Sequence, residues 1–239
     1  MNSPSFTDHG SGRPVLLLHG GGGPVSVAAF AATLAEHARV ITPTHPGFQD
    51  TPRPDALTDV PGLARLYAQL LEELDLRDVV VVGNSVGGWI AAELALLQTQ
   101  RVGALVLVDA VGIEVPGHPV ADFFSLSMPE VMGLSYFAPE RFPVPPPAPA
   151  NRAALELYAG RDFADPGLRE RLAGVTTPTT VIWGEADWIV DPEYGRALAE
   201  AIPGASFQLL ERTGHLPQLE TPDALLQALL AVISQTAPV

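Results

Sequence analysis

Short apolar runs alternate with longer segments of helical composition along most of this chain. The apolar runs lie at residues 14–19, 39–42, 78–83, 104–109, 179–183 and 206–210. Helical patterns occupy residues 27–37, 60–75, 86–98, 193–201 and 222–234. An apolar run without polar alternation is typical of a strand that is buried on both faces. The pattern therefore predicts an α/β fold, in which helices cover both faces of a mostly parallel sheet.

The alternation stops between residues 112 and 175. This segment holds aromatic residues, methionines and the proline cluster PVPPPAPA at 143–150, and it contains no clear strand. The prolines favour a stiff loop within an insertion, with a polyproline ligand for a partner as the alternative. We expect residues 1–111 and 176–239 to form the core and residues 112–175 to form a mobile, mainly helical cap.

The stretch VVVVGNSVGG, residues 79–88, places a serine where a buried strand meets a helix. Four valines favour the strand, and the following WIAAELALL has helical composition. Small residues around Ser85 permit a tight turn that lifts the hydroxyl clear of the backbone and leaves N–H groups free at the start of the helix. The stretch is therefore typical of a catalytic nucleophile, which requires a base, an acid and an oxyanion site.

A carboxylate and an imidazole follow the last two apolar runs. Asp187 comes after the run at 179–183, and His215 comes after the run at 206–210. Asp109, at the end of ALVLVD, is an alternative for the acid. Asp191 is a second alternative, although an aspartate directly before Pro192 is more typical of a helix N-cap.

The chain resembles the α/β-hydrolase superfamily at five stretches in order along nearly its whole length. These stretches are HGGGG at 19–23, PGF at 46–48, GNSVGG at 83–88, WGEADWIVDP at 183–192 and GHLPQLETP at 214–222. The resemblance implies the α/β-hydrolase fold and a triad of Ser85, Asp187 and His215, with Asp187 at the acid position of the pattern GxxDxxVxP. It also implies an oxyanion hole formed by the N–H groups of Val86 and Gly21, with Gly22 as the alternative to Gly21.

Within the superfamily, HGGGG followed by GNSVGG is most similar to serine C–C bond hydrolases of ring-cleavage products and to related cap-bearing esterases. Dehalogenases and epoxide hydrolases of this fold use an aspartate nucleophile, so the serine at position 85 argues against both. His19, directly before the glycines, is expected to hold their loop through hydrogen bonds.

The glycine run at 20–23 has a competing interpretation as a nucleotide-binding loop. A GxGxxG pattern that starts at Gly20 or Gly21 meets Val25 or Ser26 at its third glycine position, and the apolar run that follows ends without an acid for a ribose. The chain has no lysine, which excludes a Walker phosphate loop. The sequence also lacks HExxH and paired histidines at helical spacing, so we expect neither cofactor nor metal.

Composition narrows the class of protein further. The 239 residues are 47% apolar, which predicts one globular domain with an insertion. Thirteen arginines face 27 carboxylates, and the net charge of −14 disfavours nucleic acid or an anionic membrane as a partner. The chain has no cysteine and no apolar run of about 18 residues. We expect a soluble, cytoplasmic protein that acts on a small molecule, and its oligomeric state stays open.

Aromatic and methionine side chains of the insertion are candidates for an apolar ceiling over the nucleophile. The predicted substrate pocket consists of Phe123, Phe124, Met128, Met132, Tyr136 and Phe137 from the insertion, with Trp89, Trp188 and Leu216 from the core. Such a pocket favours a largely apolar carboxylic ester that is cleaved through an acyl-enzyme. One alternative is a C–C bond hydrolase of diketo acids, whose carboxylate would need Arg141 or Arg152 in the pocket. Another is a ligand-binding or signalling protein that retains the triad.

Overall fold

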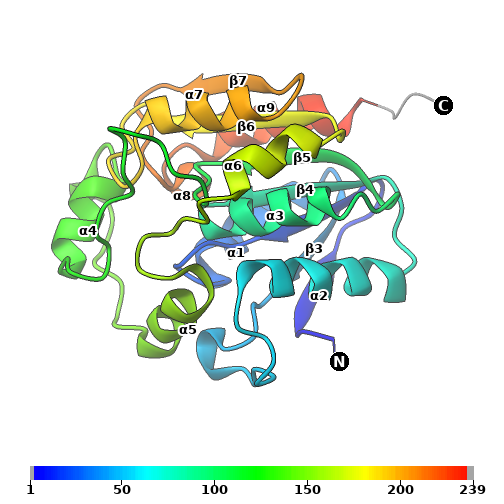
Figure 1. Ribbon diagram of the computed structural model, residues 1–239, viewed down its shortest axis with the longest axis horizontal. Helices are drawn as coiled ribbons and strands as arrows, with labels where there is room; N and C mark the ends of the chain where they lie inside the picture. Colours follow the sequence, from blue (N-terminus) through cyan, green and yellow to red (C-terminus); the bar gives the residue numbers. More distant parts are fainter. Residues whose placement is uncertain (1–2, 236–239) are drawn as a thin grey trace.

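The computed structural model describes residues 3–235 of the chain. Seven strands form one sheet in the order β1-β3-β2-β4-β5-β6-β7 (Figure 1). The strands are β1 (Phe6–His9), β2 (Pro14–Leu18), β3 (Arg39–Pro43), β4 (Val79–Asn84), β5 (Val102–Val108), β6 (Thr179–Gly184) and β7 (Ser206–Leu210). Only the β1–β3 pair is antiparallel among these described strands. The mostly parallel sheet and its six predicted strands are confirmed. Strand β1 has no predicted counterpart, because its sequence FTDH is largely polar and all four residues are exposed.

Helices cover both faces of the sheet. Five of them match the predicted helical segments: α1 (Val25–Leu34), α2 (Val60–Glu73), α3 (Val86–Leu96), α7 (Pro192–Ala201) and α9 (Pro222–Ile233). Side chains alternate along β4, so Val79 and Val81 join the apolar cluster under α2, α3 and α7, while Val80 and Val82 join the cluster under α1 and α9. Burial on both faces explains why the strand consists of valines without polar alternation.

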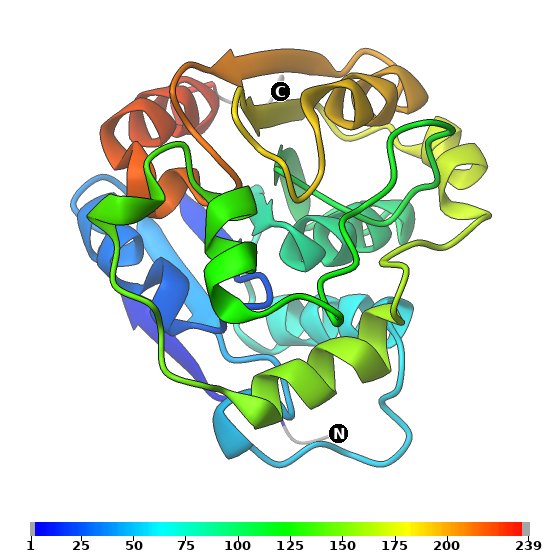
Figure 2. The same ribbon diagram turned by 90° about the vertical axis from the view of Figure 1, so that its left-hand side faces the viewer.

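The insertion, residues 112–175, contributes no strand to the sheet within the described chain. It contains α4 (Met128–Ser135), η2 (Pro139–Arg141), α5 (Pro149–Ala159), α6 (Leu168–Arg171) and η3 (Leu172–Gly174). Its one β contact is an isolated bridge between Gly112 and Ala164. Figure 2 shows α4 and α5 in front of the carboxyl ends of the strands, the edge at which ligands bind in open parallel sheets. The mobility of this insertion stays a prediction.

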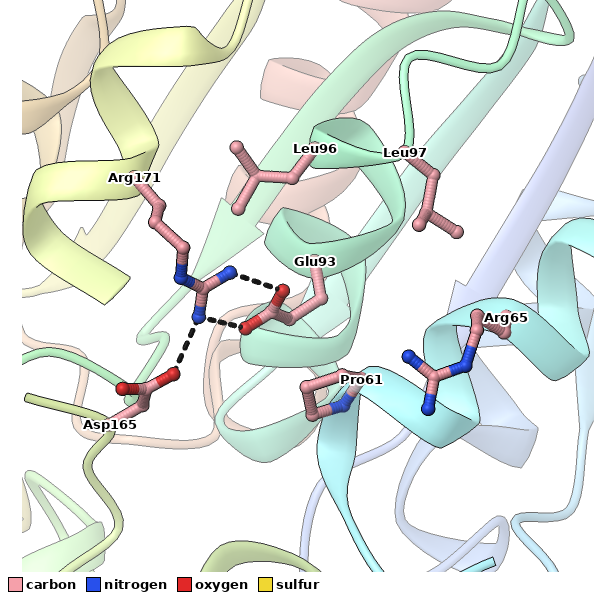
Figure 3. Close-up of a pocket in the computed structure, with 7 residues that line it drawn as sticks. All are labelled: Pro61, Arg65, Glu93, Leu96, Leu97, Asp165 and Arg171. Carbon is pink, nitrogen blue, oxygen red and sulfur yellow. Dashed lines mark hydrogen bonds and ion pairs between the residues drawn. The ribbon is translucent and has the colours of Figure 1, made fainter. Parts of the chain in front are cut away.

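An ion pair links the end of the insertion to helix α3 (Figure 3). Arg171 donates to both carboxylate oxygens of Glu93, at 2.8 and 2.7 Å, and also pairs with Asp165. The Glu93 side chain is only 5% exposed and lies at the edge of an open hollow between α2, α3 and α6. Because a buried carboxylate is costly without a partner, this pair holds the insertion against the core.

Within residues 3–235, every helix is too short or too polar to cross a bilayer.

Candidate active site

The turn between β4 and α3 holds Ser85 in a strained backbone conformation. Its φ of 55° and ψ of −121° lie outside the regions that an L-residue ordinarily occupies. The N–H of Ser85 donates to the carbonyl of Val108 at 2.9 Å, and its own carbonyl accepts from Gly88 at 2.9 Å. These bonds hold the strained turn that presents the side chain at the sheet edge, as expected of a nucleophile elbow.

Close backbone approach explains the glycines on both sides of this serine. A Cβ on Gly83 would lie 2.1 Å from the carbonyl oxygen of Gly87, and a Cβ on Gly87 would lie 2.3 Å from the carbonyl oxygen of Leu18. Both obstacles are backbone atoms, which cannot move aside as a flexible side chain would. The small residues around Ser85 are therefore required by packing against β2 and by the tightness of the turn itself.

A histidine and an aspartate meet beside this turn. His215, after β7, shares a hydrogen bond of 2.7 Å between its Nδ1 and Oδ2 of Asp187, after β6. The other oxygen of Asp187 accepts the N–H groups of Ile189 and Val190 at 2.9 and 3.1 Å, and the side chain is fully buried. These contacts orient the imidazole, as an acid partner does in a serine triad.

The alternative acids have different contacts. Asp191 caps α7, accepting the N–H groups of Glu193 and Tyr194. Asp109 accepts the N–H of Gly184 at 2.7 Å. The carboxylate bonded to His215 is thus that of Asp187.

Ser85 and His215 line the same cavity. Asn84, directly before the serine, donates from its side-chain amide to the carbonyl of His215 at 3.1 Å, which links the turn to the histidine loop. The described residues show no direct hydrogen bond between the Ser85 hydroxyl and the imidazole. Such catalytic bonds often tighten only when substrate is bound.

The glycine run after β2 borders the serine. A Cβ on Gly20 would lie 3.0 Å from that of Ser85. The N–H of Gly23 donates to the carbonyl of Gly20 at 3.1 Å, a turn bond that does not use the N–H groups of Gly21 and Gly22. Both glycines line the cavity. Val86 is the first residue of α3, so its N–H has no acceptor within the helix. The choice between Gly21 and Gly22 as oxyanion donor stays a prediction.

Two buried histidines, His19 and His45, hold this glycine loop through hydrogen bonds. Nδ1 of His19 bonds to the carbonyl of Gly20 at 2.8 Å, and its Nε2 accepts the N–H of His45 at 3.2 Å. His45 donates from Nε2 to the carbonyl of His19 at 2.9 Å and accepts the hydroxyl of Tyr67 at Nδ1. These partners require neutral imidazoles in fixed tautomers. Burial lowers the pKa of His45 to about 4, and burial together with His45 lowers the pKa of His19 well below its usual value.

A cavity of about 850 Å³ opens above Ser85. Five of the nine predicted pocket residues line it, namely Phe123, Met128, Met132, Tyr136 and Leu216. Sequence reasoning missed another part of the lining, which includes residues 145–151 and Leu155. The sequence predicts the proline cluster as a stiff loop, with a polyproline ligand as the alternative, and its position within the insertion is a signal that it borders the site.

The other four predicted pocket residues lie outside the cavity lining. Trp89 packs in the core beneath the insertion, with its Nε1 donating to Glu93 at 3.4 Å. Phe124 stacks on Phe163, with ring centroids 5.4 Å apart. Phe137 and Trp188 are exposed, at 45% and 62%. Aromatic character alone did not distinguish a cavity wall from core packing or from the surface, and these four assignments are corrected.

Helix α5 brings two polar side chains to the cavity. Asn151 accepts the N–H of Gln49 at 2.7 Å, which links α5 to the loop after β3. Arg152 lies against the rings of Phe123 and Phe124, with its guanidinium carbon 5.2 and 5.1 Å from their centroids, and donates to the carbonyl of Phe124. The described lining includes Arg152 and not Arg141. The cavity lining is therefore largely apolar, with one arginine, Arg152, and one carboxylate, Asp50.

Helix α4 is bonded directly to the two loops that carry Asp187 and His215. The carbonyls of Leu134 and Ser135, in the last turn of α4, accept the N–H groups of Trp188 at 3.0 Å and His215 at 2.7 Å. The carboxylate of Glu220 accepts the N–H groups of residues 137, 138 and 214, at 3.0, 3.0 and 2.7 Å. This end of the insertion is thus part of the scaffold of the site.

Comparison with known proteins identifies the family of the chain. A model of the alpha/beta hydrolase family matches residues 15–228. A 2-hydroxy-6-oxo-2,4-heptadienoate hydrolase from Pseudomonas putida is 31% identical over 89% of this chain and 86% of its own length. An esterase from Thermogutta terrifontis is 25% identical, with a TM-score of 0.79 over 97% of this chain and 94% of its own. A meta-cleavage product hydrolase, 22% identical, has the same fold with a TM-score of 0.79 over 97% and 94% of the two chains. The chain belongs to the α/β-hydrolase family.

Proposed function

We propose that this protein is a serine hydrolase in which Ser85 attacks a carbonyl carbon. His215 takes the proton of the serine hydroxyl, and Asp187 orients the imidazole and stabilises the imidazolium that forms. The N–H groups of Val86 and of Gly21 or Gly22 bind the oxygen that becomes negative. The leaving group receives the proton from His215, and water then releases the acyl group from Ser85 by the same steps in reverse. The observation that carries the proposal is the His215–Asp187 bond beside the strained serine turn.

The cavity supports a largely apolar carboxylic ester as the substrate. Its walls are mainly aliphatic, aromatic and proline side chains, and its volume of about 850 Å³ is that of a small-molecule site. An apolar acyl or alkoxy group gains free energy by leaving water for such walls, whereas a charged group would need a partner.

A C–C bond hydrolase is the second candidate, and Arg152 favours it. Substrates of that class carry a carboxylate, for which a guanidinium in the cavity wall is a suitable partner. The 31% identity to the heptadienoate hydrolase supports the same reading. Two contacts weaken it, because Arg152 already packs on two phenylalanine rings and donates to a main-chain carbonyl.

The two candidates differ in the substrate that reacts fastest. We expect kcat/KM for a short p-nitrophenyl ester to exceed that for a 2-hydroxy-6-oxo-dienoate by at least about tenfold, and Arg152→Gln to change neither value by more than about threefold. Glutamine is polar and keeps an N–H donor, and it removes the positive charge. Arg141→Gln, outside the cavity lining, is the matched control. The opposite result would establish the C–C candidate. In that result, kcat/KM is about 10²-fold higher for the dienoate than for the ester, and the preference disappears in Arg152→Gln but not in Arg141→Gln.

Covalent labelling separates an enzyme from a binding protein that retains the triad. A fluorophosphonate should form an adduct on Ser85, and Ser85→Ala should abolish both the adduct and ester turnover. Mass spectrometry of the labelled peptide locates the adduct. An unreactive Ser85 in folded protein would favour the ligand-binding alternative.

A further inference from the structure

A second carboxyl group lies beside the acid of the triad. Asp109 follows β5 and is completely buried. Its Oδ1 accepts the N–H of Gly184, whereas its Oδ2 is buried and has no hydrogen-bond partner among the described residues. One oxygen of Asp109, one oxygen of Asp187 and one ring nitrogen of His215 all lie within 4.8 Å of one another. The proposed mechanism assigns no role to Asp109.

The carboxyl groups of Asp187 and Asp109 accept different numbers of hydrogen bonds. Asp187 receives two N–H groups and the imidazole of His215. Asp109 receives a single N–H, and no cation contacts it among the described residues. Hydrogen bonds stabilise the ionised form of a carboxyl group, and burial without donors stabilises the protonated form. If one of the two keeps a proton, it is Asp109.

The backbone fixes the direction of the Asp109 side chain. Its φ of 46° is in the left-handed region, which aspartate tolerates better than most residues. Its N–H donates to the carbonyl of Ile182 at 3.0 Å, and Ser85 bonds to Val108 immediately before it. Asp109 is thus held between the strand of the nucleophile and the strand of the acid.

We propose that Asp109 is a neutral carboxylic acid that donates its proton from Oδ2 to the carboxylate of Asp187. The inference rests on the proposed function, in which Asp187 is the ionised acid of the triad. The two carboxyl groups then carry one negative charge, and Oδ2 of Asp109 gains the partner it otherwise lacks. Asp109 is a positioning residue, because it acts on His215 through Asp187 and contacts no substrate. In agreement, burial and the charge of Asp187 raise the pKa of Asp109 well above its usual range, against the opposing effect of the Gly184 N–H.

The charged groups near Asp109 come from two loops. Asp187 lies in the loop after β6 and His215 in the loop after β7. An ionised Asp109 would stabilise the imidazolium of His215, so that removing its charge would move the acidic limb of the pH profile to lower pH. If Asp109 is neutral, the acidic limb of the pH profile should not move in a variant that has no ionisable group at position 109.

The substitution Asp109→Asn separates these cases, because asparagine reproduces the acceptor for Gly184 and the donor for Asp187 without an ionisable group. We expect kcat/KM of Asp109→Asn to remain within about threefold of the unchanged protein, with the same acidic midpoint. Asp109→Ala should lower kcat by about 10- to 100-fold, because Asp187 loses a hydrogen bond that positions it. Asp187→Asn is the control, with a loss of about 10⁴. A shifted midpoint in Asp109→Asn, a loss equal to that of Asp109→Ala, or full activity in folded Asp109→Ala would each overturn the proposal.

Infrared difference spectroscopy tests the proton itself without any substrate. At neutral pH, the spectrum of the wild-type protein minus that of the Asp109→Asn variant should show the C=O band of a protonated carboxyl group. The absence of that band would overturn the proposal even if Asp109→Ala did not fold. This measurement does not depend on turnover, so it tests the proton on Asp109 even if the protein has no ester turnover. Fluorophosphonate labelling separately reports whether Ser85 is reactive. The two results together show which of the two proposals has failed.

Discussion

At the scale of single residues, backbone contacts decide which side chains the nucleophile turn accepts. Gly87 faces the carbonyl of Leu18, and Gly83 faces the carbonyl of Gly87. Neither glycine provides a chemical group to the reaction. Both permit the strained serine turn to lie directly against β2, where the glycine loop begins.

Gly87→Ala should therefore impair both stability and activity. The added Cβ would lie 2.3 Å from a backbone oxygen, so β2 and the turn must move apart. We expect the free energy of unfolding to fall by roughly 1–3 kcal/mol and ester turnover to fall with it. Urea unfolding and steady-state kinetics measure the two effects. Gly133→Ala in α4 is the control, because nothing lies within 4 Å of its Cβ position, and it should be neutral or slightly stabilising.

The buried histidines make stability dependent on pH. His45 has a folded-state pKa of about 4, below the value of about 6.5 in an unfolded chain. The unfolded state therefore binds more protons in this interval, and the stabilisation present above pH 6.5 is lost as the pH falls towards 4. We expect His45 to account for roughly 3 kcal/mol of that loss.

Unfolding curves at several pH values check this expectation. His45→Asn should make the dependence of the unfolding free energy on pH shallower between about pH 6.5 and 4. The exposed His37 offers the control, since His37→Asn should leave the slope unchanged. An identical slope in His45→Asn would mean that other groups cause the acid sensitivity.

At the scale of elements, helix α4 is connected to the two loops that carry Asp187 and His215. Its last-turn carbonyls bond to residues 188 and 215, and Glu220 bonds to the segment that follows the helix. We therefore expect motion of the insertion at the proline cluster, because α4 is bonded to these loops and α5 is bonded to the loop after β3 through Asn151 and Gln49.

Glu220→Gln tests the coupling between α4 and the histidine loop. The amide retains one acceptor oxygen for three N–H groups, and it removes the charge that strengthens those bonds. We expect a loss of about 1–3 kcal/mol in local stability, faster amide exchange at residues 137, 138 and 214, and lower kcat. Glu140→Gln, at an exposed site of η2, is the control. Unchanged exchange at these amides would show that Glu220 does not hold the loop.

At the scale of the whole molecule, the ion pair of Arg171 and Glu93 holds the insertion against the core (Figure 3). Arg171→Met would leave the carboxylate of Glu93 buried without its main partner. The Arg171 side chain is 42% exposed, so water can reach the carboxylate once the guanidinium is removed; we expect the free energy of unfolding to decrease by about 1–3 kcal/mol, with ester turnover of the folded protein largely retained. Thermal or urea unfolding measures the change. Arg169→Met, on the exposed side of α6, should cost little; equal losses in the two variants would contradict the role of the pair.

Much of the site was predictable because its residues follow local patterns. A valine run ending at a glycine-flanked serine specifies a strand, a turn and a helix within ten residues, and Asp187 and His215, the proposed acid and base, each follow an apolar run. The distribution of pocket residues was less predictable. Trp89 and Phe123 have the same apolar character, but one packs under the insertion and the other faces the cavity.

The sequence by itself determined the alternation of six strands with five helices, the tight serine turn and the candidates for its base and acid, because period and glycine spacing act over short distances along the chain. Only the tertiary structure decided which carboxylate meets His215, which of the aromatic side chains line the cavity and where the proline cluster lies. It also placed Asp109, the alternative acid in the sequence analysis, next to Asp187. These relations depend on strand order and on the path of the insertion, which join residues far apart in the chain.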